Sequence, residues 1–204
     1  MGRNQEKKAA IDIALLPPDD VIEKLISIKR QAGEKVWGPL GKNDYIPHIS
    51  LAMGCVKESE LAAVREIVEK VAGRFGPISI VLDGLYFADK PGGDRNYAIG
   101  AKKSLPLQEL HESMMKALQS YLCYDCEKEM LFREPGQDVT EPNYINKFLS
   151  SHSFENFDPH ITTRAKVDVG KDDLPMAFAA DRIAVWHIGT MTTCRKVLFE
   201  TKLI

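Results

Sequence analysis

Hydrophobic residues recur along the chain with two periods, and the alternation of these periods predicts an α+β protein with several antiparallel strands. Apolar runs rich in β-branched residues predict strands, whereas apolar residues three and four positions apart predict amphipathic helices. Strands are expected at residues 9–16, 48–53, 78–87 and 97–101, at a short segment that begins at His160, and at 181–190 and 196–203. Helices are expected at residues 19–28, 59–71, 105–122, 143–150 and 172–180.

Local signals place several of these boundaries. Pro17-Pro18 ends the first strand, and Asp19-Asp20 opens the first helix. Ser59 is the expected N-cap of the second helix, and Gly73 ends that helix.

Two stretches have no clear hydrophobic period. Residues 33–44 contain several glycines and are expected to form a mobile loop beside the first motif described below. Residues 124–158 contain Pro135 and Pro142, and we expect this stretch to be a lid or a family-specific insertion.

The composition is typical of a globular protein with one domain that spans residues 1–204. Hydrophobic residues make up 44% of the chain and charged residues 27%, which suffices for a buried core. The formal net charge of −2 argues against a surface for long nucleic-acid tracts. No apolar run approaches membrane-spanning length, and the polar start of the chain has no signal region. We therefore expect a cytoplasmic monomer without a membrane partner.

The four cysteines are expected to be reduced residues that pack in the interior. Cys123 and Cys126 form a Cys-x-x-Cys pair, but the chain has no second such pair, and a zinc site would need two more ligands. A reducing cytoplasm also disfavours disulfides. Metal or redox use of the pair is the less favoured alternative.

Two short stretches of the chain repeat each other. They are Pro47-His48-Ile49-Ser50 and Pro159-His160-Ile161-Thr162. An aromatic residue lies three positions before each histidine, Tyr45 in the first copy and Phe157 in the second. A proline followed by apolar or β-branched residues is typical of a strand that is entered from a turn.

Each copy brings one histidine and one hydroxyl to the same face of its strand, because successive side chains of a strand point to opposite faces. The pairs are His48 with Ser50 and His160 with Thr162. A histidine can take up or release a proton near neutral pH, and a hydroxyl can donate a hydrogen bond to a phosphate oxygen. If the copies converge, they provide a proton acceptor, a proton donor and two phosphate contacts around one atom.

This paired pattern resembles the two-histidine (2H) phosphoesterase superfamily, whose signature is one H-x-[ST]-x motif in each half of a domain. The superfamily includes RNA 2′,3′-cyclic phosphodiesterases, also called 2′-5′ RNA ligase-like proteins. Here the motifs are His48-Ile49-Ser50-Leu51 and His160-Ile161-Thr162-Thr163, and the order of elements and the chain length also fit. The resemblance implies a bilobal fold: two related lobes of antiparallel sheet, with helices outside, share a central groove.

The resemblance also implies a metal-independent cyclic phosphodiesterase that hydrolyses a nucleoside or RNA 2′,3′-cyclic phosphate to a 2′-phosphate and needs no cofactor. His160 is expected to be the general base and His48 the general acid, while Ser50 and Thr162 are expected to bind the phosphate. The substrate would be a small nucleotide or an RNA end. One alternative is a non-catalytic nucleotide-binding module with the same groove, and another is a metal site on His48, His160 and His187.

Three further residues are expected to contact the substrate. Many RNA-processing members of the superfamily carry an arginine five residues after each motif histidine, where this chain has Met53 and Ala165. Arg164 is the nearest cation and shares the strand face of the second motif histidine, so we expect it to contact the phosphate. Tyr45 and Phe157 are expected at the groove mouth, where each could stack on a base or shape the turn.

The remaining histidines are interpreted as structural. His111-Glu112-Ser113 also matches H-x-[ST], but it lies in a helical run, where residues two apart point about 200° from each other. We therefore expect it to lie on a solvated helix face. His152 is expected to be exposed in a polar loop, and His187 to pack within an apolar strand.

Overall fold

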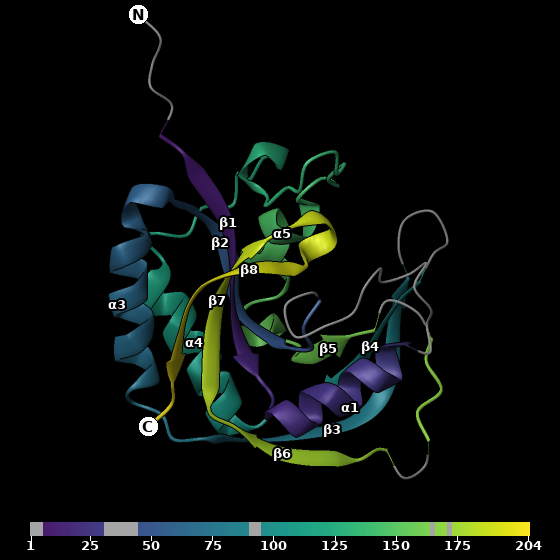
Figure 1. Cartoon of the computed structure of the whole chain (residues 1–204). Helices are drawn as coiled ribbons and strands as arrows, with labels where there is room; N and C mark the ends of the chain where they lie inside the picture. The colour runs from purple at the N-terminus through teal and green to yellow at the C-terminus, as the bar shows by residue number, and fades with distance from the viewer. Residues whose placement is uncertain (1–5, 31–44, 90–94, 164–165, 171–172) are drawn as a thin grey trace, which may run out of the picture.

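Two four-stranded antiparallel sheets form the framework of the protein, as a computed structural model shows (Figure 1). The structure describes residues 6–30, 45–89, 95–163, 166–170 and 173–204. The predicted loop at 33–44 and the residue Arg164 lie outside these ranges. The α+β class and the bilobal arrangement predicted from the sequence are confirmed.

The first sheet has the strand order β2-β1-β7-β8. These strands are β2 (Ile49–Lys57), β1 (Lys8–Leu16), β7 (Arg182–Ile188) and β8 (Cys194–Lys202). Strand β1 is buried along nearly its whole length, which explains why its sequence is an apolar run rather than an alternation. One of its faces joins the main core, and the other packs against α1 (Asp19–Arg30) through Leu16 and Ile22.

The second sheet has the order β5-β4-β3-β6. Its strands are β5 (His160–Thr162), β4 (Arg95–Ala101), β3 (Ile78–Asp89) and β6 (Met176–Ala180). Both sheets therefore carry a motif strand at one edge, followed by an antiparallel partner: β2 beside β1, and β5 beside β4. The two motif strands lie in contact with each other, so the site forms where the sheets meet.

Helices cover the outside of the first sheet and fill the space beside the motif strands. Figure 1 shows α3 (Leu61–Ala72) and α4 (Leu105–Leu118) side by side at the face of this sheet. The Ser104 side chain caps α4 by accepting a hydrogen bond from the Leu107 amide at 3.4 Å. The short helix α5 (Asn143–Ser151) packs on β2 and belongs to the stretch predicted as a lid or insertion.

Two local predictions are wrong. The predicted helix at 172–180 contains the edge strand β6, in which Met176 and Ala180 are buried while Ala177 and Ala179 are exposed. Pairing with β3 overrides the helical propensity of this Ala-rich segment. Ser59 is not the N-cap of α3: it lies in a 3₁₀ turn and its hydroxyl donates to Glu6 at 2.7 Å.

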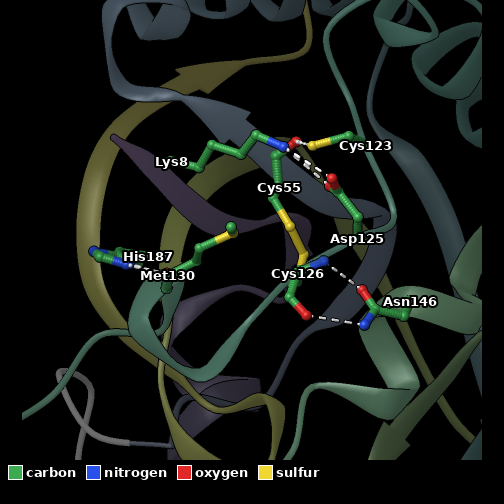
Figure 2. Close-up of a disulfide and its surroundings, with 8 residues drawn as sticks. All are labelled: Lys8, Cys55, Cys123, Asp125, Cys126, Met130, Asn146 and His187. Carbon is green, nitrogen blue, oxygen red and sulfur yellow. Dashed lines mark hydrogen bonds and ion pairs between the residues drawn. A yellow bond between two sulfur atoms is a disulfide. The ribbon is translucent and has the colours of Figure 1, made fainter. Parts of the chain in front are cut away.

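The prediction of four reduced cysteines is also wrong, because Cys55 and Cys126 form a disulfide (Figure 2). The chain after α4 returns to β2, where the backbones of Cys55 and Cys123 exchange two hydrogen bonds of 2.9 Å. This return brings Cys126 beside β2. The Asn146 side chain then bonds the amide and carbonyl of Cys126 at 2.8 and 3.0 Å, so the disulfide links β2 to α5.

No helix within the described ranges combines the length and the apolar character that a membrane crossing requires.

We predict that losing the disulfide lowers the free energy of unfolding by roughly 2–4 kcal/mol, because a cross-link between distant positions restricts the unfolded chain. The Cys126→Ser variant and the wild type are compared by urea unfolding. Cys123→Ser is the control, since it keeps the disulfide. Alkylation of the denatured, unreduced wild type should label Cys123 and Cys194 only, and labelling of all four cysteines would contradict the assignment.

Candidate active site

A cavity of about 390 Å³ lies where the two motif strands meet. His48 and Ser50 from the first copy and His160 and Thr162 from the second copy all line it. The structure therefore brings together the four residues that the repeated motif singled out. The charge of His48 is one of the causes that lower the pKa of His160, so the two imidazoles lie within electrostatic reach of each other.

Both imidazoles are fixed by the same backbone contact. His48 Nδ1 donates to the carbonyl of Ile46 at 2.7 Å, and His160 Nδ1 donates to the carbonyl of Asp158 at 2.8 Å. In each copy the acceptor lies two residues before the histidine, across the motif proline, whose ring fixes the backbone between them. Because a carbonyl oxygen only accepts, Nδ1 carries a hydrogen and Nε2 is the nitrogen available for chemistry.

A buried carboxylate lies beside the first pair. Asp12, from β1, is fully buried, and its Oδ2 accepts a 2.7 Å hydrogen bond from the Ser50 hydroxyl. The same oxygen lies 3.3 Å from His48 Nε2. The Cys194 thiol lies 3.6 Å from Nε2, and burial, together with the charge of Asp12, raises its pKa. Asp12 was not among the residues predicted from the sequence, although a single acid within an apolar run was a signal that could have marked it.

The second pair has a different environment. Burial lowers the pKa of His160, and the positive charge of His48 lowers it further. The carbonyl and the carboxylate of Asp158 oppose this shift without reversing it. The Tyr86 ring meets the imidazole edge-on, with 5.7 Å between the ring centroids. His160 therefore favours the neutral state at neutral pH.

A buried lysine brings positive charge to the cavity. Lys29 of α1 lines the cavity, is only 4% exposed, and donates to the carbonyl of Tyr45 at 3.3 Å. The phosphate-binding cation predicted from the sequence was Arg164, which lies outside the described residues. Lys29 was not predicted, because it is part of the basic end of an ordinary amphipathic helix.

Both predicted aromatic residues line the cavity, but their packing differs. The Arg195 guanidinium lies 5.1 Å from the centroid of the Tyr45 ring, a cation–π contact at the cavity wall. Phe157 is only 4% exposed and stacks on His111 with 3.9 Å between the ring centroids. The environment of Phe157 favours the interpretation that its ring shapes the turn before β5.

His111 is fully buried, so the prediction that it lies on a solvated helix face is wrong. Its Nδ1 donates to the carbonyl of Leu51 at 2.6 Å, and its Nε2 accepts from the amide of Phe154 at 2.8 Å. His111 thus joins β2 to the segment that leads into β5. The two bonds require a neutral ring, and burial lowers the pKa of His111 to about 4.

The helix α5 forms an apolar wall of the cavity. Tyr144, Ile145 and Phe148 line the cavity from this helix, and His152 follows at its end. His152 was predicted to be exposed, but it is partly buried and stacks on Tyr144 with 4.4 Å between the ring centroids. Burial lowers the pKa of His152, and the charge of His160 adds to this effect.

His187 does not belong to this cavity. It packs within β7, as predicted, and donates from Nε2 to the carbonyl of Met130 at 2.9 Å. The alternative metal site on His48, His160 and His187 would need His187 beside the two motif histidines. Asp12, His48 and Cys194 bring ligand atoms within 4.8 Å of one another, but their contacts with Ser50 and Ile46 indicate a hydrogen-bonded network.

Comparison with known families and structures identifies similar proteins over nearly the whole chain. The family model of the 2′-5′ RNA ligase superfamily matches residues 17–195. The structure of TT0787 from Thermus thermophilus has a TM-score of 0.59 and 17% sequence identity, covering 95% of this chain and 97% of that one. The structure of E. coli LigT complexed with 3′-AMP has a TM-score of 0.56 and 14% identity, covering 97% and 98%.

A further structure of E. coli LigT, complexed with NADP+, has a TM-score of 0.55 and 15% identity, covering 97% of this chain and 99% of that one. At these identities the likeness shows a shared fold. Comparison with curated protein sequences gives no match.

We predict that protonation of His111 contributes to acid unfolding. Its pKa of about 4 in the folded protein lies below the ordinary histidine value of about 6.5, so the fold favours the neutral ring. The stabilisation is present above about pH 6.5 and is lost as the pH falls toward about 4, with a total of roughly 3–3.5 kcal/mol. Urea unfolding at about pH 7.5 and about pH 4.5 measures this loss.

The control is His111→Gln, which cannot titrate. It should be less stable than the wild type at neutral pH but should lose less stability on acidification, because the remaining loss comes from other groups. Equal losses in the two proteins would contradict the role of His111.

Proposed function

The chain belongs to the 2′-5′ RNA ligase superfamily, and from that premise we propose that it hydrolyses a nucleoside or RNA 2′,3′-cyclic phosphate to a 2′-phosphate. Membership in this superfamily of 2H phosphoesterases supports a phosphodiesterase- or ligase-type activity. The observation that carries the specific proposal is the lining of one cavity by both histidine–hydroxyl pairs. The cavity volume of about 390 Å³ lies in the range of small-molecule sites.

The proposed reaction moves two protons between the histidines and the reacting oxygens. His160, neutral because its pKa is lowered, takes a proton from a water molecule through Nε2 as the water oxygen attacks phosphorus. The bond between phosphorus and the 3′ oxygen breaks. His48 gives a proton from Nε2 to that leaving oxygen, and the product keeps its phosphate on the 2′ oxygen. In this scheme the histidines handle both protons, and no metal ion is required.

Hydroxyl and ammonium groups stabilise the charge of the phosphate. Ser50 and Thr162 hydrogen-bond its non-bridging oxygens, where charge is held in the transition state. The Ser50 hydroxyl donates to Asp12 in the structure, so it must turn away from the carboxylate to reach a phosphate oxygen. Lys29 lines the cavity and supplies positive charge to the bound anion, and Arg164 is a further candidate for this role.

The rest of the cavity suits a nucleotide. We assign the nucleoside to the apolar wall formed by α5, with Tyr45 as a candidate stacking partner. A small nucleotide or the end of an RNA fits this enclosed space and the slightly negative net charge better than a long nucleic-acid tract. E. coli LigT, which has this fold, was crystallised in complex with the nucleotides 3′-AMP and NADP+.

We predict that His48→Ala and His160→Ala each lower the rate of 2′,3′-cyclic nucleotide hydrolysis by roughly 10²–10⁴-fold, because each removes one proton transfer. The rate is measured with cyclic mononucleotides and with an oligonucleotide that ends in a cyclic phosphate, and phosphorus NMR identifies the product isomer. His187→Ala is the matched control, since His187 lies outside the cavity lining and should leave the rate near the wild-type value.

Full activity in both motif-histidine variants would exclude the mechanism. Binding of nucleotides without turnover by the wild type, seen as a raised melting temperature, would support the non-catalytic nucleotide-binding module instead.

A second prediction concerns pH and metals. The profile of kcat/KM should be bell-shaped, and its acidic limb should lie below the ordinary histidine value of about 6.5, because the pKa of the proposed base His160 is lowered. Activity should also survive treatment with EDTA and gel filtration. A rate that is lost with the chelator and restored by added zinc would contradict the metal-independent mechanism.

A further inference from the structure

The similarity between the two sheets extends from the motif strands to their antiparallel partners. Ser50 of β2 pairs with Ala14 of β1, and Thr162 of β5 pairs with Ala98 of β4. Two residues before each alanine, on the same strand face, the chain has Asp12 in β1 and Asn96 in β4. Counted from these alanines, Asp12 and Asn96 occupy matching positions, although a register shift between Ile13 and Ala14 places Asp12 opposite Met53. One residue is a carboxylate and the other its neutral amide analogue.

The Asp12 carboxylate lies where it can form an ion pair with a His48 ring that carries a hydrogen on both nitrogens. Nδ1 donates to the Ile46 carbonyl, so its hydrogen is fixed. Asp12 Oδ2 lies 3.3 Å from Nε2, which is an ion-pair distance. A protonated ring would form an ion pair with this carboxylate, and the pair would be strong because Asp12 is fully buried.

The burial of the whole Asp12 carboxylate favours a cation beside it. Asp12 Oδ1 is buried and has no hydrogen-bond partner among the described residues. Such an atom is costly, and a purely structural contact with the Ser50 hydroxyl would be served as well by an amide oxygen. A buried carboxylate is costly unless a positive charge lies beside it, and a protonated His48 ring at 3.3 Å would supply that charge.

Asn96 provides the comparison within the same molecule. It lines the cavity on the side of the second motif, beside the strand that carries His160. An amide at this position adds no charge, and His160 favours its neutral form. The two histidines share the same backbone contact and line the same cavity. On the partner strands β1 and β4, the main difference between their surroundings is therefore Asp12 against Asn96.

We propose that Asp12 is a positioning residue that keeps His48 protonated and so makes it the proton donor, while Asn96 leaves His160 free to act as the proton acceptor. This assignment rests on the hydrolysis proposed above and explains how two nearly identical motifs take opposite roles. Asp12 transfers no proton itself. Its charge stabilises the imidazolium before the reaction, and the proton on Nε2 passes to the leaving oxygen.

Other groups also act on the two rings. The buried Cys194 thiol faces His48 from β8, and Lys29 of α1 lines the same cavity. Asp158 and His152 act on His160, and the two motif histidines repel each other when both are charged. None of the described groups beside His48, apart from Asp12, is a carboxylate within ion-pair distance.

The test uses full-length protein with ¹⁵N-labelled histidine and reads the protonation of each imidazole by NMR near neutral pH. His48 should have two protonated nitrogens in the wild type, and His160 should have one. In Asp12→Asn the protonated fraction of His48 should fall at the same pH. In Asn96→Asp the protonated fraction of His160 should rise. Ser50→Ala is the matched control, because it removes the hydroxyl from Asp12 but keeps the charge, so His48 should stay protonated.

Kinetics provide the second readout. In Asp12→Asn the alkaline limb of the kcat profile should move to lower pH by roughly one unit, with a loss of roughly 10-fold on the alkaline side and little change in KM. In Asn96→Asp the acidic limb should move to higher pH by roughly the same amount. Thermal melting verifies that both variants, which change few atoms, remain folded.

The outcomes separate this inference from the proposed function. A neutral His48 in the wild type, or an unchanged NMR signal and pH profile in Asp12→Asn, overturns the role of Asp12 even if the enzyme hydrolyses cyclic phosphates. Loss of His48 protonation in Asp12→Asn, in a protein that turns over no cyclic phosphate, supports the electrostatic effect of Asp12 and overturns the hydrolysis.

Discussion

The bond from each motif histidine to the carbonyl two residues before it determines what the cavity can do. An imidazole has two nitrogens, and a ring that turns freely would present either of them in either protonation state. The contacts of His48 with Ile46 and of His160 with Asp158 fix Nδ1 as a donor in both copies. The proline between acceptor and ring makes this geometry part of the local chain. The same four-residue stretch therefore positions the same atom twice.

The position of the two copies relative to each other depends on contacts outside the cavity. His111 bonds to Leu51 in β2 and to Phe154 before β5, and it stacks on Phe157, so one buried ring holds both motif strands. The disulfide between Cys55 and Cys126 connects β2 to the start of the segment that carries α5 (Figure 2). Strand β2, which carries His48 and Ser50, is thus cross-linked to the segment that carries the α5 wall of the cavity.

The sequence predicted what depends on local pattern and on the repeated motif. Three features could be predicted because each has a periodic or duplicated signal in the sequence. They are the helices with a clear apolar stripe, the buried strand β1 and the convergence of both motifs on one cavity. The remainder depends on contacts between distant segments. Neither the edge pairing of β6 nor the return of Cys126 to β2 has a local signal. His111 and Lys29 looked like ordinary polar positions of amphipathic helices until the structure showed them buried.

The difference between Asp12 and Asn96 bears on the orientation in which a cyclic phosphate would react. A site with true twofold symmetry would accept a cyclic phosphate in two opposed orientations, and either ring oxygen could then leave, giving a mixture of isomers. Under the proposed roles, the carboxylate–amide difference between the matched strands would remove this degeneracy, because only the side of His48 would supply a proton to the departing oxygen. The regiochemistry of the product would then be set from within the sheet, by a residue that has no surface exposed to the substrate.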